Sequence, residues 1–413
     1  MKFGHSSGTE TAKDPAKYKM HMALGLMFLT VFIDLIGFGI IIPLLPLYAK
    51  QFGANGFVVG LLMMSYSLMQ FFFAPMWGRL SDRIGRRPVL LISLTVSAIG
   101  YSIWGFADSL WILFLSRIVA GFGNANLAVA QAYVADVTPE EYRSQGMGMI
   151  GAAFGLGFTL GPAIAGISSH FGVHPNTLGF FAAFFSLVDL AFTAKFLPEP
   201  ENRKENAHNP FANGGEFFLR TVSNRQLQLS LFIIFISTFA FANMETTLVL
   251  LTSKFYGFTI AENSYLFAGL GIVMVFVQGF LIRKIGKKFA DAPLISVGSG
   301  LIAIGLILTP ITHNLVVLCV GLIILATGSG INNPANNSLL SKLSPKTETG
   351  GVMGIGQSMS TLGRILGPVV GGYMFDTMGA GSPYWLGAIC MLLACALSFK
   401  LPRIQKVQPV VST

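Results

Sequence analysis

The chain reads Gly78-Arg79-Leu80-Ser81-Asp82-Arg83-Ile84-Gly85-Arg86-Arg87-Pro88 between two long apolar runs. Glycine tolerates the backbone angles of a tight turn, so Gly78 and Gly85 allow two helices to fold back on each other. Asp82 is placed to cap a neighbouring helix N-terminus, where negative charge is favourable. Arginines next to an apolar span hold a loop on the cytoplasmic side of a membrane. The stretch predicts a tight connection between two membrane spans.

The composition is that of a membrane protein. Of the 413 residues, 53% are hydrophobic and only 11% are charged, whereas about 25% are charged in an ordinary soluble domain. About twelve apolar runs between His21 and Leu401 reach the ~20 residues that a helix needs to cross a bilayer. We expect an all-α membrane protein with twelve transmembrane helices in two pseudo-symmetric six-helix bundles.

The net charge of +9 reports topology. If the N-terminus is cytoplasmic and the spans alternate, only Lys50 and Lys254 of the 27 Lys and Arg fall outside, and Arg117 and Arg364 lie within spans. This bias follows the positive-inside rule and predicts that both termini are cytoplasmic. The basic residues therefore do not indicate a nucleic-acid partner. We expect a multi-pass protein of the inner (plasma) membrane, surrounded by the lipid bilayer.

The domain organisation follows the apolar runs. The first run is too long for a signal peptide and is expected to remain as span one. The predicted units are a cytoplasmic N-terminal tail at 1–21, an N-terminal bundle at 22–197, a polar cytoplasmic linker at 198–226, a C-terminal bundle at 227–401 and a cytoplasmic tail at 402–413. Within the linker, residues 216–225 are expected to form a short helix along the inner surface.

The two halves of the chain repeat each other. Gly78 recurs as Gly279 at an offset of 201 residues, and Pro162 recurs as Pro368 at an offset of 206. Repeats of half the chain are typical of transporters whose binding site lies between the repeats.

These patterns resemble the major facilitator superfamily. The stretch from Gly78 to Pro88 matches the loop between spans two and three of that family. The acid Asp34, followed by Gly-x-Gly and Pro-x-x-Pro, resembles span one of the drug:proton antiporter group, and the whole chain looks most like tetracycline-type exporters. Those exporters carry further acids in spans three and nine and a histidine in span eight, which are absent here at mid-span. The drug that such an exporter would carry therefore stays open.

Three charged residues are the expected proton-coupling residues: Asp34, Glu245 and Arg117. A charged acid at the bilayer centre costs ~2.5–3.5 kcal/mol on insertion scales, which favours a functional role for Asp34. The resemblance implies that Arg117 lies close to the proton-carrying acid. The alternatives are a structural acid at Asp34, an arginine reaching the membrane interface, and a structural or interfacial Glu245. Asp189 is expected to be structural.

The remaining expected site residues fall into three groups. Polar substrate contacts within the spans are Asp34, Gln70, Asn126, Glu245, Asn333 and Gln357. The resemblance implies a conformational latch, with Asp136 paired to Arg83 or Arg86, formed by Gly78, Asp82, Arg83, Gly85, Arg86, Arg87 and Asp136. It also implies an antiporter motif in span five at Gly157, Gly161, Pro162 and Gly166, although small residues serve helix packing as well.

No motif indicates an enzyme. The chain has no Walker-type phosphate loop and no metal-ligand cluster, because His170 and His174 lack a third ligand nearby. We expect no cofactor and no bound metal. Without a phosphate loop the chain is not expected to hydrolyse ATP, so transport must draw its energy from a gradient. The hypothesis is a monomeric proton-coupled antiporter that exports small amphipathic compounds by alternating access, with protons and a small-molecule substrate as partners. The alternatives are a proton-coupled symporter of a small metabolite and a lipid-handling or receptor-like member.

Overall fold

The computed structural model describes residues 15–124, 126–138, 142–200, 214–286, 288–311, 314–345 and 348–402. Within these residues every regular element is helical. The first half contains α1 (Pro15–Gln51), α2 (Gly56–Ile84), α3 (Arg86–Gly105), α4 (Leu110–Gly123), α5 (Asn126–Val137), α6 (Arg143–His170) and α7 (Pro175–Phe196). The second half contains α8 (Gly214–Ser223), α9 (Arg225–Tyr256), α10 (Ile260–Phe276), the π-helix η1 (Val277–Leu281), α11 (Ile282–Ile285), α12 (Asp291–Ile311), α13 (Leu315–Leu343), α14 (Thr349–Thr377) and α15 (Ser382–Ser398).

The helices supply the predicted membrane crossings. In the described residues, ten helical segments are long and apolar enough to span a membrane, and α4 with α5 counts as one of them. The 17-residue α15 is a shorter apolar helix. The 29-residue α14 is long enough but is more polar, because it carries Gln357, Ser358, Ser360 and Arg364. With these two helices the count reaches the twelve expected from the sequence.

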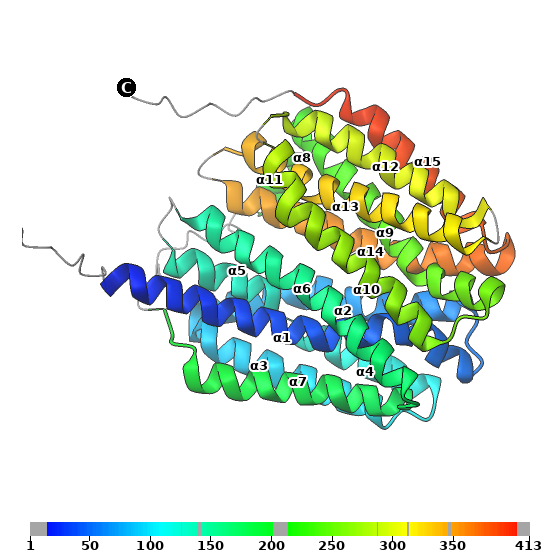
Figure 1. Ribbon diagram of the computed structural model, residues 1–413. Helices are drawn as coiled ribbons and strands as arrows, with labels where there is room; N and C mark the ends of the chain where they lie inside the picture. Colours follow the sequence, from blue (N-terminus) through cyan, green and yellow to red (C-terminus); the bar gives the residue numbers. More distant parts are fainter. Residues whose placement is uncertain are drawn as a thin grey trace, which may run out of the picture.

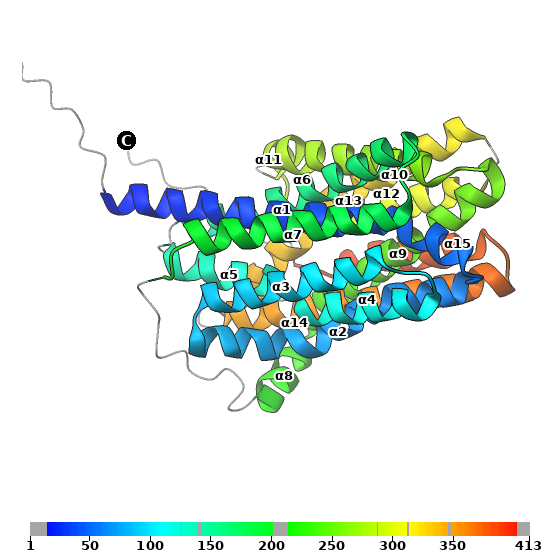
Figure 2. The same ribbon diagram turned by 90° about the horizontal axis from the view of Figure 1, so that it is seen from below.

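The crossings form two bundles. The N bundle (α1 to α7) is held by packing of α1 on α6 and α7, and of α3 on α4 and α7. The C bundle (α9 to α15) is held by packing of α9 on α14, and of α12 on α13 and α15. Between the bundles, α2 packs on α14 and α6 packs on α10. Figures 1 and 2 show the helices running side by side, and in Figure 1 α1, α3 and α7 of the first half lie on one side while α12, α13 and α15 of the second half lie on the other.

The two ends of the molecule differ. We call the end that carries the start of α1 and the end of α15 the terminal end, and the opposite end the far end (Figure 1). One apolar cluster joins both bundles and draws its N-bundle residues from the far half of the helices. It includes Leu45, Leu62, Phe158, Leu248 and Phe267. At the terminal end the core divides into a cluster around Trp77 and Tyr133 in the N bundle and one around Leu231 and Leu340 in the C bundle. The bundles are therefore packed together at the far end and separate towards the terminal end.

The linker contributes one amphipathic helix to the C bundle. This helix, α8, lies in the region where a short helix was expected. Its Phe217 ring packs beside Gly351 at the start of α14, within the apolar cluster of that bundle. Arg220 on α8 forms an ion pair with Glu348, immediately before α14. The described part of the linker is thus attached to the C bundle.

Candidate functional site

Asp34 lies inside the N bundle, close to tyrosine hydroxyls. It is 6% exposed on α1, and it interacts electrostatically with Tyr66 on α2 and Tyr101 on α3. The Tyr101 ring packs against α1 at Gly37, where a Cβ atom would lie 3.5 Å from Tyr101 Cε2, an ordinary van der Waals distance. A carboxyl group in this position is removed from lipid and surrounded by polar groups from neighbouring helices.

Arg117 interacts with the same two tyrosines as Asp34, Tyr66 and Tyr101, and is packed between aromatic rings. Its side chain on α4 is 3% exposed, so it does not reach a membrane interface. The guanidinium carbon lies 5.0 Å from the centre of the Trp104 ring and 5.7 Å from that of Tyr101. Cation–π contacts of this kind replace part of the lost hydration of a buried cation. One guanidinium nitrogen, Nη2, has no hydrogen-bond partner among the described residues.

A chain of polar side chains runs from Tyr66 towards the start of α5. Gln70 on α2 donates to Asn124 Oδ1 at 3.1 Å, and Asn124 donates in turn to the Tyr66 hydroxyl. Asn124 lies at the break between α4 and α5. Gln70 was expected at the site, whereas Tyr66 and Asn124 were not. Their spacing offers one signal, since Tyr66 and Gln70 lie one helical turn apart.

The C bundle presents a different pair of charges. Glu245 on α9 is partly exposed and interacts electrostatically with Arg364 on α14. Among the described ion pairs none joins these two residues. Neither charge is neutralised by a described ion pair with the other, so each is able to contact a third charged or polar group.

The other polar residues expected at the site are more dispersed. Asn333 on α13 and Gln357 on α14 are exposed side chains. The neighbouring Asn332 is buried and donates to Ser299 Oγ at 2.8 Å, which ties α13 to α12. The side chain of Asn126 lies outside the described residues. The structure therefore brings together Asp34, Gln70 and Arg117 from the N bundle, and Glu245 with Arg364 from the C bundle.

The glycines of the expected antiporter motif bring helices into close contact. A Cβ atom on Gly161 would lie 2.6 Å from Gly39 Cα, and one on Gly157 would lie 2.5 Å from Leu35 Cβ. Both positions let α6 pack against α1 directly beside Asp34. Gly166 faces the other bundle, where a Cβ atom would lie 2.9 Å from the Tyr265 ring of α10. Pro162 lies inside α6 between these contacts.

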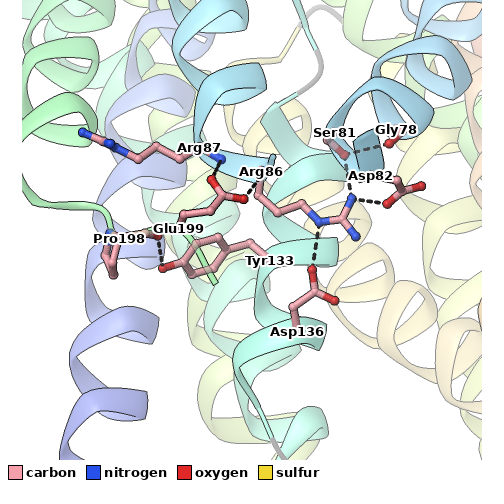
Figure 3. A network of polar contacts seen from close by, with 9 residues as sticks. All are labelled: Gly78, Ser81, Asp82, Arg86, Arg87, Tyr133, Asp136, Pro198 and Glu199. Atoms are coloured by element: carbon pink, nitrogen blue, oxygen red, sulfur yellow. Dashed lines mark hydrogen bonds and ion pairs between the residues drawn. The ribbon is translucent and has the colours of Figure 1, made fainter. Parts of the chain in front are cut away.

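The charged turn between α2 and α3 is centred on Arg86 (Figure 3). Arg86 Nε lies 2.8 Å from Asp136 Oδ2, and Arg86 Nη1 lies 2.5 Å from Asp82 Oδ1. Arg86 Nη1 also donates to Ser81 Oγ at 2.6 Å. Gly85 is buried and adopts a φ of 119°, a conformation that a residue with a side chain rarely takes. Of the two arginines expected to pair with Asp136, the structure selects Arg86.

The N-terminus of α3 is capped by a residue absent from the sequence prediction. Glu199, just after α7, accepts hydrogen bonds from the Arg86 and Arg87 backbone N–H groups at 2.7 and 2.9 Å (Figure 3). A carboxylate here satisfies two of the unpaired N–H groups that begin a helix. The capping role expected of Asp82 therefore belongs to Glu199, while Asp82 pairs with Arg86. Arg83 is exposed and makes none of the described ion pairs, so its place in the latch stays a prediction.

The C bundle has a counterpart of this charged pair. Asp291 at the start of α12 pairs with Lys342 near the end of α13, and it also accepts a hydrogen bond from Ser338 at 3.0 Å. Asp291 follows Arg86 by 205 residues and Lys342 follows Asp136 by 206. Arg86 and Asp291 each start a helix, and Asp136 and Lys342 each lie near the end of the next crossing, so the two pairs occupy equivalent places with the charges exchanged.

A carboxylate also joins the two bundles at the far end. Asp376 on α14 accepts from the backbone N–H groups of Gly56 at 3.0 Å and Phe57 at 2.8 Å, at the start of α2. We call these three residues the far-end clamp. Close packing of Gly60 and Gly372 against the opposite helix surrounds it. Sequence reasoning missed Asp376, because nothing in the local pattern indicates that its partner lies 320 residues away.

Comparison with known proteins identifies the family. The model of the Major Facilitator Superfamily matches residues 27–292 and 284–412. The chain belongs to the Major Facilitator Superfamily. The predicted family and its all-α fold are thus confirmed, and the relatives of this transporter are transporters rather than enzymes.

The names of relatives of this Major Facilitator Superfamily transporter refer to different cargoes. Tetracycline resistance protein, class E, of Escherichia coli is 32% identical, with 92% of this chain and 94% of that protein covered. Major facilitator superfamily domain-containing protein 10 of Mus musculus is 30% identical, with 91% and 90% covered. The crystal structure of the human organic anion transporter MFSD10 (TETRAN) superposes with a TM-score of 0.74 at 26% identity, covering 94% of this chain and all 100% of that one.

Proposed function

We propose that this multi-pass membrane transporter is a proton-coupled antiporter that exports small amphipathic compounds by alternating access. It acts as a monomer in the inner (plasma) membrane, with both termini in the cytoplasm. The charge bias along the sequence supports this orientation. The observation that carries the proposal is Asp34, an acid in the middle of the first crossing that is 6% exposed and interacts electrostatically with the buried Tyr66 and Tyr101. Such residues inside membranes mark ion pathways.

The proposed orientation assigns the conformation described here to one step of the cycle. The terminal end faces the cytoplasm, so the bundles are open inward and closed outward by the far-end clamp. Substrate enters from the cytoplasm and favours loss of the proton from Asp34. The clamp then opens, the charged turns at the terminal end approach the other bundle, and a proton from outside returns to Asp34 as substrate leaves. The small residues of α6 beside Gly39 let α1 shift during this exchange.

Transport into inverted vesicles tests the proposal. With an imposed pH gradient, wild-type protein is expected to exchange protons for a tetracycline, whereas Asp34→Asn abolishes the exchange and leaves folded protein. Asp108→Asn, which changes an exposed acid of the same bundle, is the matched control and retains exchange. Undiminished coupling in Asp34→Asn would refute the proposed role. Co-uptake of protons and substrate would indicate a symporter, and no proton flux with any substrate would indicate a lipid-handling or receptor-like member.

A second candidate function is transport of organic anions. The observation that favours it is Arg364, a cation inside the membrane-spanning α14 that interacts with Glu245 without a direct ion pair. A planar guanidinium binds carboxylates well. The name of the human organic anion transporter MFSD10 (TETRAN) gives a precedent within the family.

Competition between substrates separates the two functions. If the cargo is anionic, aromatic carboxylates inhibit tetracycline exchange, and Arg364→Gln weakens their binding about tenfold, equivalent to ~1.4 kcal/mol. If the cargo is a cationic or neutral amphipath, Arg364→Gln leaves its affinity unchanged. Lys254→Gln, near the far end of α9, serves as the control for removal of a basic charge outside the bundle interior.

A further inference from the structure

Asp189 is a buried acid that the proposed cycle does not yet use. It lies on α7 and is 0% exposed. Its neighbours Thr30 on α1 and Thr193 on α7 are equally buried. Asp34 follows Thr30 by one helical turn, and Thr193 follows Asp189 by one turn, so each helix presents one acid and one threonine to the same interface.

The hydrogen bonds of Asp189 are few and involve only hydroxyls. Thr193 Oγ1 lies 3.3 Å from Asp189 Oδ1, and the Thr193 and Thr30 hydroxyls lie 3.1 Å apart. The second carboxyl oxygen, Oδ2, has no hydrogen-bond partner among the described residues. A hydroxyl can donate or accept. This short chain therefore satisfies a neutral carboxylic acid as well as it satisfies an anion.

The charges around Asp189 do not favour an isolated anion. From α1, the titratable group that acts on it is Asp34, a like charge. From α3, Tyr101 packs with its ring against the Arg117 guanidinium of α4, and the Arg87 guanidinium donates to the Ala194 carbonyl of α7, five residues beyond Asp189. α6 has no titratable side chain between Arg143 and His170. No described ion pair includes Asp189. A buried anion without a cation beside another acid is unfavourable.

We propose that Asp189 and Asp34 form a coupled proton pair across the α1–α7 interface, so that Asp189 is a second proton-exchanging residue of the transporter. The inference deepens the proposed antiport function and rests on it. The pair keeps at least one proton, which resides on Asp189 when Asp34 is ionised. The second proton occupies Asp34 and leaves first. Interacting carboxyls of this kind release their protons in two steps that belong to the pair.

Infrared difference spectroscopy of purified protein tests the pair without transport. The background is Glu245→Gln, which removes the acid of the C bundle from the signal. At pH values above those at which exposed carboxyls protonate, titration of the protonated-carboxyl band is expected to show two steps in this background, one step in the Asp34→Asn variant, one step in the Asp189→Asn variant, and none when both acids are replaced. Thr193→Val, which keeps the carboxyl and removes its hydroxyl partner, shifts the frequency of the Asp189 band. Asp108→Asn is the control and changes neither step.

Two outcomes would overturn the pair. If Asp189→Asn titrates as its parent does, Asp189 does not exchange protons. If Asp34→Asn leaves the remaining Asp189 step at the same pH as in the parent, the two acids are not coupled. If Asp189→Asn fails to fold, Thr193→Val decides, since an unchanged band places no proton on Asp189. Failure of antiport with an intact two-step titration would refute the proposed function and retain the pair.

Discussion

The two bundles share one architecture and use charge in different ways. In the N bundle, Asp34, Asp189 and Arg117 are almost completely buried. In the C bundle, the pair Glu245 and Arg364 is partly exposed, and α13 uses buried asparagines in place of charges. The two halves therefore pack their helices alike, while among the described residues the almost completely buried charges at mid-span lie in the N bundle.

The charged pairs at the terminal end also differ between the two bundles. Arg86 with Asp136 and Asp291 with Lys342 join equivalent helices with opposite polarity. The place of the pair follows from the fold, since both join the start of one helix to the end of another. The fold does not determine which of the two helices carries the acid and which carries the base. The N-bundle pair differs in its extra partners, because Arg86 also contacts Asp82 and Ser81.

The largest expected effect is on the rate of exchange, and it differs between replacement of Asp34 and replacement of Glu245. Asp34→Asn is expected to lower proton-driven exchange by about 100-fold or more, ~2.7 kcal/mol in the barrier, because it removes the group whose proton is exchanged for substrate in the proposed cycle. Glu245→Gln is expected to lower it by about tenfold, ~1.4 kcal/mol, because Glu245 is partly exposed and faces Arg364. Initial rates in vesicles under a fixed pH gradient measure both.

Equal losses in these two variants would break the comparison, since they would give both bundles the same share in coupling. Binding of substrate at fixed pH is the accompanying control. It reports whether a variant has lost the site or only the coupling.

The next effect concerns the charged pairs. Lys342→Asp places two acids at the start of α12 and is expected to lower the free energy of unfolding by about 3 kcal/mol, because Asp291 is buried. The exchange Asp291→Lys with Lys342→Asp is expected to recover at least half of that loss. The corresponding exchange of Arg86 and Asp136 recovers less, since aspartate at position 86 repels Asp82. Thermal unfolding in detergent measures these differences.

Arg83→Ala is the matched control for this series, because Arg83 is exposed in the same turn. Its effect is expected within about 0.5 kcal/mol. Full recovery in both exchanged pairs would contradict the special role of the Arg86 network. No recovery in either would mean that geometry rather than charge holds these helices.

A smaller effect is expected at the close helix contacts, where the bundles should behave alike. Gly161→Val and Gly367→Val each place a Cβ atom 2.6 Å from backbone of the packed helix, Gly39 Cα and Phe239 O respectively. Overpacking of this kind costs about 1–3 kcal/mol. Gly148→Val is the control, since a Cβ atom there meets nothing within 4 Å. Loss of stability in only one bundle would show that their packing is not equivalent.

The smallest expected effect is at the far-end clamp. Asp376→Asn leaves one acceptor oxygen where the carboxylate has two, so one of the two backbone hydrogen bonds is lost and the other becomes neutral. Closure is expected to weaken by about 1 kcal/mol. In protein whose three cysteines are replaced, a single cysteine at Val369 is expected to react about five times faster with a thiol reagent when Asp376 is Asn, equivalent to ~1 kcal/mol. Unchanged reactivity would mean that apolar packing alone closes this end.

Much of the fold followed from the sequence because membrane crossings impose length and apolarity. The twelve helices, the repeat and the turn at Gly85 could all be predicted from local patterns. The span α14 shows the limit of composition, since its polar residues keep it out of the strongly apolar group. In the sequence, α14 was recognised as a membrane crossing from its length, its Gly-Pro pair and its place in the internal repeat.

The site was less predictable because its contacts join distant segments. Glu199 caps α3 across 113 residues and Asp376 caps α2 across 320. No local pattern encodes either meeting. Asparagines on α13 were visible as a group, yet only the structure separates buried Asn332 from exposed Asn333. The proximity of Asp34 and Asp189 likewise depends on how α1 and α7 pack.

The attachment of α8 to the C bundle decides where the chain can be divided. Because Phe217 packs beside Gly351 and Arg220 pairs with Glu348, α8 belongs with the second half although it precedes α9. Two co-expressed fragments separated before Gly214 should reassemble, each with its own folded surface. If the chain is divided after Ser223, α8 stays on the first fragment, and the start of α14 in the second fragment loses the helix that covers it.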